Sequence, residues 1–153
     1  MTSTVDERRL KLQEIHATID GVRSAPKRMP DTIHESWLPC VVTYPGPAQH
    51  GLAARDRRRE DREYVVRLYV RPFTLGKDTD QGFSECVPFL DRFVDKYMDD
   101  SVVVPSTGEW EELRFEAGQG DGGVGIIPLH GVRNGPQYWG IVFDLTIIYK
   151  ENL

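Results

Sequence analysis

The two cysteines are the residues of this 153-residue chain with the most direct route to covalent chemistry. Cys40 lies within W-L-P-C-V-V-T-Y-P-G-P-A, residues 37–48, and Cys86 lies at the start of an expected helix. A cysteine attacks as the thiolate, which requires a nearby imidazolium, metal ion or helix N-terminus. Proline and valine flank Cys40, and V-P-F follows Cys86. We interpret both thiols as buried packing groups, and a cysteine nucleophile with a distant histidine is the alternative.

The histidines and acidic pairs carry no metal or acid–base signature. No H-x-H or H-E-x-x-H motif is present, and Asp78 and Asp80 lack the glycine and distal glutamate of a calcium loop in register. Glu111 and Glu112 would point to opposite faces of a strand. We therefore predict no catalytic residue, metal or cofactor, and we interpret His16 as a helix-flank residue. The other histidines are His34, His50 and His130.

A glycine-rich segment, G-Q-G-D-G-G-V-G at 118–125, has the composition of a phosphate-binding loop. A P-loop continues into Lys-Ser/Thr and a helix, and a dinucleotide fingerprint needs a strand before it and a helix after it. Strand-like sequence lies on both sides of this segment instead. We interpret it as the tip of a hairpin.

The run R-D-R-R-R-E-D-R-E at 55–63 holds five arginines and four acids. Mixed signs weaken a phosphate groove, whereas guanidinium groups pair well with carboxylates in two-pronged hydrogen bonds. The run suits either a solvated hairpin arm or an interface with a like segment of a neighbouring copy. The sequence leaves both interpretations open.

Composition narrows the class of function. The formal net charge is −5 and the isoelectric point is near 5.4, which argues against a dedicated nucleic-acid binder. No apolar run approaches the ~18 residues of a membrane span, and the N-terminus lacks the apolar segment of a signal peptide. We expect one domain over residues 1–153, made in a reducing compartment and without membrane contact.

Apolar spacing predicts two helices. A capping box at Thr4 precedes a stripe spaced 3, 4 and 3 residues apart, and Gly21 marks the expected helix end. The stripe consists of Leu12, Ile15, Ile19 and Val22. A second helix is expected at about 84–98, with Pro88 tolerated near its first turn. A polar linker, 74–81, precedes this helix.

The remaining apolar segments predict strands. The first is Leu38–Tyr44, ended by the Tyr44-Pro45-Gly46-Pro47 turn and followed by loop-like sequence from Gln49 to Arg59. The residues from Trp139 to Tyr149 alternate without a break, which is the strongest period-two pattern in the chain. The other expected strands are Glu63–Phe73, Val102–Val104, Trp110–Phe115 and Val124–Leu129. This order predicts a single α+β domain, with two helices on one face of a mostly antiparallel sheet and extended arms.

Several of these segments together resemble the tail terminator, or tail-to-head joining, proteins of long-tailed bacteriophages. They are the amphipathic first helix, the W-L-P-C-V-V-T-Y-P-G-P segment, the charged arm and the Tyr64–Phe73 strand, then V-P-F-L-D-R-F and Y-W-G-I-V-F-D-L-T-I-I-Y. The resemblance covers nearly the whole chain and lies in the order of the elements and in their general sequence character. It implies a virion protein, made in the host cytoplasm, that forms a ring of six copies.

Such a ring caps the tail tube, ends tube polymerisation and presents a surface to the head-side connector. DNA passes through its lumen without specific binding, and an acidic subunit suits a bore along which phosphates slide. The arm 49–63 and the glycine loop 118–125 are then the expected contacts to neighbours, tube or connector. The candidate interface residues are Arg55, Arg57, Arg58, Arg59, Arg62 and Asp121.

Two alternatives remain. Another head–tail connector or tail-completion protein of the neck has the same expected features, and only its position in the particle separates it from a terminator. A small enzyme or ligand-binding α+β domain that uses Cys40 or Cys86 belongs to a different class, and thiol reactivity distinguishes it from a scaffold.

Overall fold

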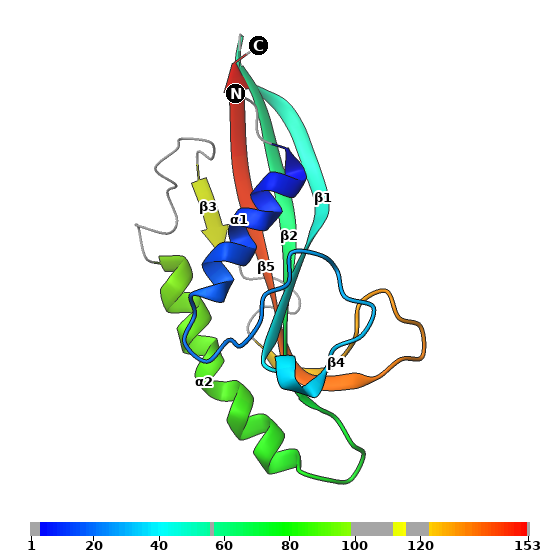
Figure 1. The fold of residues 1–153 in the computed structure, drawn as a ribbon. Helices are drawn as coiled ribbons and strands as arrows, with labels where there is room; N and C mark the ends of the chain where they lie inside the picture. The colour runs from blue at the N-terminus through cyan, green and yellow to red at the C-terminus, as the bar shows by residue number, and fades with distance from the viewer. Residues whose placement is uncertain (1–3, 56, 99–111, 116–122, 153) are drawn as a thin grey trace.

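Five strands form one antiparallel sheet that two helices cover on one face (Figure 1). The structure is a computed structural model that describes residues 4–55, 57–98, 112–115 and 123–152. The strand order is β1-β2-β5-β3, and β4 pairs with another part of β5. This arrangement confirms the predicted α+β class. The elements are α1 (Val5–Ala17), a 3-10 turn (Glu35–Trp37), β1 (Cys40–Ala54), β2 (Arg57–Pro72), α2 (Thr79–Met98), β3 (Glu112–Phe115), β4 (Gly123–Pro128) and β5 (Gln137–Asn152).

Strand β5 lies at the centre of the sheet and pairs with β2, β3 and β4. Its alternating residues face two different environments, as the period-two pattern predicted. One set, which includes Phe143 and Leu145, is fully buried against the helices. Both helices contribute to the same core cluster, Leu12 from α1 and Phe93 from α2 among them, so both lie on the same face of the sheet.

Helix α1 begins as predicted and ends earlier than predicted. The Thr4 hydroxyl accepts a hydrogen bond from the Glu7 backbone N–H, and the Glu7 side chain accepts one from the Thr4 N–H, which completes the capping box. The helix ends at Ala17, and the C-cap Thr18 donates its hydroxyl to the Ile15 carbonyl at 2.6 Å. Ile19 still reaches the core from this turn.

The prediction that Pro45-Gly46-Pro47 ends the first strand is wrong, and so is the loop expected from Gln49 to Arg59. Strand β1 continues through the prolines to Ala54, and β2 begins at Arg57. Two features accommodate the prolines. β1 is an edge strand, where a missing N–H is tolerated, and a register shift between Pro45 and Ala48 forms a bulge.

Helix α2 is longer than predicted. It begins at Thr79 instead of residue 84, so Pro88 lies in the helix interior and the preceding linker is shorter. Gly82 allows the first turn of α2 to pack closely against β5. A Cβ atom at Gly82 would collide with the indole of Trp139, so glycine lets α2 approach β5. Five residues of α2 face the core: Gly82, Cys86, Phe89, Phe93 and Tyr97.

The predicted strands near the C-terminal third are confirmed where the structure describes them. The described part of the Trp110–Phe115 prediction is β3, and Val124–Leu129 corresponds to β4 shifted by one residue. The end of the glycine-rich segment, Gly123–Gly125, belongs to β4 and not to a hairpin tip. Val102–Val104 and the rest of the glycine-rich segment lie outside the described residues.

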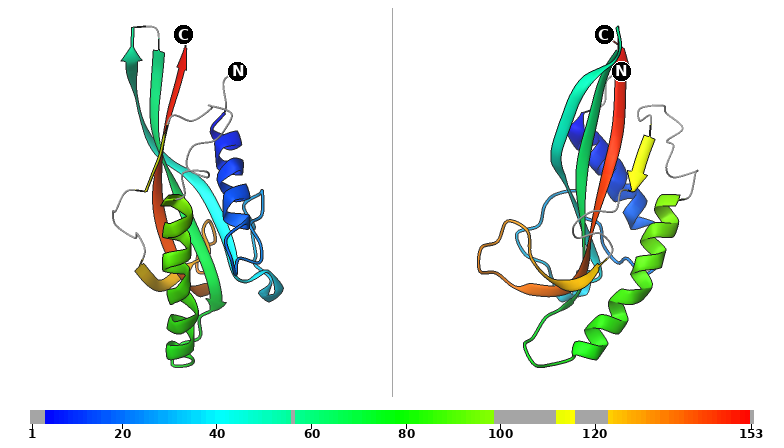
Figure 2. Two further views of the ribbon diagram at one scale, coloured as in Figure 1. Left: turned by 90° about the vertical axis from the view of Figure 1, so that its left-hand side faces the viewer. Right: turned by 180° about the vertical axis from the view of Figure 1, so that it is seen from behind.

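The β1–β2 hairpin and the end of β5 project beyond the N-terminal end of α1 (Figure 2). We call this projection the arm and define it as residues 48–54, 57–63 and 146–152. Its three strands lie side by side, with Gln49 opposite Asp61 and Asp61 opposite Ile148, and the β1–β2 register shifts once more between Leu52 and Ala54. The predicted charged arm is therefore a three-stranded sheet that continues the sheet of the body.

Candidate interaction site

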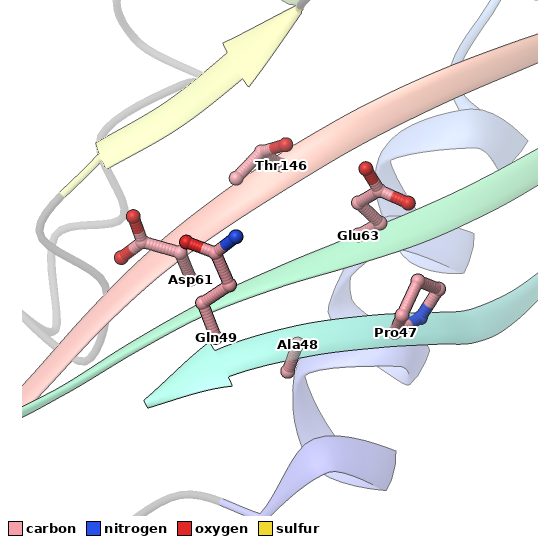
Figure 3. A pocket seen from close by; sticks show the side chains of 6 residues that line it. All are labelled: Pro47, Ala48, Gln49, Asp61, Glu63 and Thr146. Atoms are coloured by element: carbon pink, nitrogen blue, oxygen red, sulfur yellow. The ribbon is translucent and has the colours of Figure 1, made fainter. Parts of the chain in front are cut away.

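The β2 side chains of the arm are charged and alternate between two faces, whereas Ile147, Ile148 and Tyr149 of β5 are buried. The inner face of the arm lies on the same side as the helices and includes Glu60 and Arg62. These residues are four and two positions from buried Tyr64, so their side chains point to the same side of the strand. The outer face lies on the opposite side and includes Asp61 and Glu63 (Figure 3). Each face has its own arrangement of charges.

The inner face is attached to α1 by a buried arginine. The Arg8 Nη2 donates to Glu60 Oε1 at 3.0 Å, and the Arg62 Nε donates to the same oxygen at 2.8 Å. The Arg8 guanidinium also lies 4.2 Å from the ring centroid of Tyr149, in cation–π geometry. Arg8 is only 2% exposed. These contacts fix the arm to the first helix and set its direction.

The electrostatics of Glu60 match this geometry. Burial raises the pKa of Glu60, but the hydrogen bond and charge of Arg62, with the charges of Arg8 and His50, outweigh burial and lower it. The nearest His50 nitrogen lies 3.8 Å from the Glu60 carboxylate. Glu60 is therefore ionised at neutral pH and serves as the centre of the inner-face network.

The outer face contains a groove of about 490 Å³ (Figure 3). Its walls come from β1, β2 and β5, and the bulge in β1 forms one side. The lining residues are Pro47, Ala48, Gln49, Asp61, Glu63 and Thr146. Two carboxylates, an amide and a hydroxyl give this groove an acidic, hydrogen-bonding surface.

The two carboxylates of the groove differ in their partners. Asp61 accepts two hydrogen bonds from Arg59, at 2.7 and 2.9 Å, in the two-pronged arrangement that favours arginine. Glu63 is exposed, and among the described residues it has no ion-pair or hydrogen-bond partner. The groove therefore offers one unneutralised carboxylate.

The structure brings the candidate arginines together on the arm and gives them different roles. Arg55 is exposed at the hairpin turn, and Arg58 is exposed on β2 nearby. Arg59 pairs with Asp61, and Arg62 pairs with Glu60 and donates to the Gly46 carbonyl at 3.1 Å. Two candidates lie outside the described part of the molecule: the side chain of Arg57, which begins β2, and the whole of Asp121.

Sequence reasoning named the arginines of the arm and missed its acids. Glu60 accepts hydrogen bonds on the inner face, Asp61 accepts them on the outer face, and Glu63 lines the outer groove. The order of these acids in the sequence was the available signal. Residues 55–59 hold four arginines and one aspartate, whereas residues 60–63 hold three carboxylates and one arginine. The charges are thus segregated between the tip and the base of the arm.

Both cysteines are buried, as interpreted from the sequence. Burial raises the pKa of the Cys40 thiol, and burial with the charge of Glu85 raises the pKa of Cys86 to about 12. Both groups are thiols at neutral pH and lie in apolar clusters. Neither environment generates the thiolate that a nucleophile requires.

The interpretation of His16 as a helix-flank residue is wrong, because its side chain is fully buried. Its Nε2 lies 2.7 Å from the Tyr97 hydroxyl, and its Nδ1 lies 3.2 Å from Gln13 Oε1. The Thr43 hydroxyl donates to the same Gln13 oxygen at 2.7 Å. Burial lowers the pKa of His16 to about 3, so the ring is neutral and joins α1, β1 and α2.

A second hollow, of about 350 Å³, lies beside the loop that connects β4 to β5. The Arg67 Nη1 donates to the Pro128 carbonyl at 2.9 Å, and His130 stacks on Tyr44 with ring centroids 3.9 Å apart. The backbone N–H of His130 donates to the Tyr69 hydroxyl at 3.1 Å. These contacts hold the loop against the sheet, and we assign them a structural role.

The part of the chain that the structure describes contains no group of three His, Cys, Asp or Glu side chains that could hold a metal ion. None of its helices is long and apolar enough to cross a membrane. No protein-family model matches the chain, and no curated protein matches it. The geometry of the arm is therefore the main basis for a functional proposal.

Proposed function

We propose that this chain is a structural virion protein, the tail terminator of a long-tailed bacteriophage. In this proposal six copies form a ring that caps the tail tube, ends tube polymerisation and presents an interface to the head-side connector. DNA passes through the lumen of the ring. The proposal rests on the family resemblance of the sequence together with the arm.

The arm is the observation that carries the proposal. It extends the sheet beyond the helices, and Arg8 joins its inner face to α1 through Glu60 and Tyr149. Its outer face has a charged groove, and Leu52 near its end is 70% exposed. A projecting sheet with this surface is suited to contact a neighbouring subunit. When such contacts join two different patches, they close into a ring or extend into a filament.

The charge of the chain is consistent with a DNA passage. A formal net charge of −5 on each of six subunits gives a strongly acidic ring. Phosphates are repelled from an acidic bore, so DNA passes without a binding site that would hold it. Arg55, exposed at the hairpin turn of the arm, is then placed for protein contacts.

Growth of tail tubes tests the proposal. Purified protein is mixed with the tube protein of the same phage, and tube length is measured by electron microscopy with and without it. The expected result is tubes of limited length with a cap at one end. A strict monomer that leaves tube length unchanged contradicts the proposal. A ring found elsewhere in the neck of the particle would identify the head–tail connector alternative.

A further inference from the structure

We propose that the arginine tip of one arm binds the acidic outer groove of the arm on a neighbouring copy. This inference rests on the proposed function, since it supplies the contact that would join the subunits of the ring. The tip is represented by Arg55 at the hairpin turn, and the groove by Glu63 with Asp61 beside it. The occupant of the groove is thus a second copy of this chain.

The two patches cannot satisfy each other within one chain. Arg55 precedes β2, and the six positions from Arg57, the first residue of β2, to Glu63 correspond to roughly 20 Å at ~3.3 Å per residue. This length is far beyond the reach of one arginine side chain. The tip of one chain therefore cannot reach Glu63 of the same chain, and Glu63 has no ion-pair partner among the described residues.

The chemistry of the groove suits a guanidinium group. A planar guanidinium carries five donors, and the groove presents the Glu63 carboxylate, the Gln49 amide and the Thr146 hydroxyl around one hollow. The Asp61 carboxylate already accepts a two-pronged bond from Arg59 and shows that this face accommodates that geometry. A guanidinium from outside would complete the same pattern at Glu63.

The edge of the sheet favours contact through side chains over addition of a strand. Pro45 and Pro47 lie on β1, the edge strand, and neither has an N–H group to donate to an incoming strand. The bulge between Pro45 and Ala48 further disturbs the edge. A neighbour at this position therefore meets the groove and its carboxylates, and tip-to-groove contacts join two different patches, as ring closure requires.

A charge swap tests the contact. The variants are Arg55→Glu, Glu63→Arg and the double variant, with Arg28→Glu as the control, since Arg28 is exposed in a loop remote in sequence from the arm. Mass against concentration is measured by light scattering at about 0.1 M salt, where charges are screened beyond ~10 Å. We expect each single reversal to weaken association by at least about tenfold and the double variant to recover to within about threefold of the original chain. Arg28→Glu should associate as the original chain does.

Other outcomes overturn the contact. An oligomer that neither single reversal weakens, or a double variant no better than the weaker single variant, contradicts the contact and leaves the ring proposal standing. A loss of association that occurs only in Arg55→Glu would mean that the tip binds a different acidic partner, such as DNA. That result also contradicts the contact. A chain that is monomeric at all concentrations, alone and with tube protein, contradicts both the contact and the proposed function.

Discussion

Strand β2 runs through both the helix-covered body and the projecting arm, and the chemistry of its side chains changes between the two. In the body, Tyr64, Val66 and Leu68 of β2 are fully buried against the helices. Beyond Tyr64, the same face of the same strand carries Arg62 and Glu60. The period of two continues unchanged. The sheet fixes the alternation of the side chains, and the element that covers a face decides whether it is apolar or charged.

The body should lose the most stability when a core side chain is removed. Phe93 is fully buried and stacks on Phe143, with ring centroids 5.0 Å apart. We expect Phe93→Ala to lower the free energy of unfolding by roughly 3–5 kcal/mol, because it leaves a cavity between α2 and β5. Urea unfolding measures the change. The matched truncation on the arm, Leu52→Ala, should cost no more than about 0.5 kcal/mol, and a similar loss in both variants would contradict the distinction between the regions.

Acid should weaken the body before it weakens the arm. His16 has a pKa of about 3 when folded and an ordinary value of 6.5, so between these values only the unfolded chain binds its proton. The stabilisation that depends on a neutral His16 is fully present above pH 6.5. Below pH 6.5 the free energy of unfolding should fall by roughly 1.4 kcal/mol per pH unit. The lowered pKa of Glu60 adds a loss only as pH falls below about 4.5. Unfolding curves from pH 7 to 5 should show this slope, and His16→Gln should flatten it; an equal slope in that variant would refute the assignment.

Two glycines offer a finer comparison of packing. Gly82 lies against the Trp139 indole, whereas Gly51 on the arm has open space where a Cβ would be. We expect Gly82→Ala to destabilise by roughly 1–3 kcal/mol, in spite of the better helix propensity of alanine. Gly51→Ala should be neutral or stabilise by up to about 1 kcal/mol, as alanine does within strands. Thermal unfolding measures both, and a tolerated alanine at Gly82 would show that α2 and β5 can separate without cost.

A smaller effect on global stability than that of the core truncation is expected where the two regions are joined. Arg8→Met should cost roughly 1–2 kcal/mol, because it removes the bond to Glu60 and the contact with Tyr149 but retains much of the apolar stem. Amide hydrogen exchange should accelerate in residues 57–62, with little change in the core strands. The exposed Arg28→Met serves as the control. Uniform acceleration across body and arm would show that Arg8 does not act specifically on the arm.

The body was predictable from the sequence because its signals are periodic. The alternation from Trp139 to Tyr149 defined β5, and the capping box at Thr4 defined the start of α1. Burial of the two cysteines followed from their apolar neighbours. In these cases a local pattern and the packed structure require the same arrangement, so the prediction did not depend on distant contacts.

The arm was less predictable because partners in space override local propensity there. Pro45 and Pro47 predict a turn in isolation, and only the pairing with β2 and the position at the sheet edge make a strand tolerable.

The buried polar side chains of α1 in the body were also hard to predict. Gln13 and His16 are polar, but Tyr97 and Thr43 form hydrogen bonds with them from other elements. The spacing of Gln13 and His16 beside Leu12 on the helix stripe was the one local signal of their burial.

The central claim is that this chain assembles through its arm into a ring, and one measurement tests it most directly. The purified protein is imaged by negative-stain electron microscopy, with its mass measured in parallel by light scattering. The account predicts rings with a central hole and a mass near six chains, and predicts their loss in Arg55→Glu. Particles that remain single chains at every concentration would contradict it.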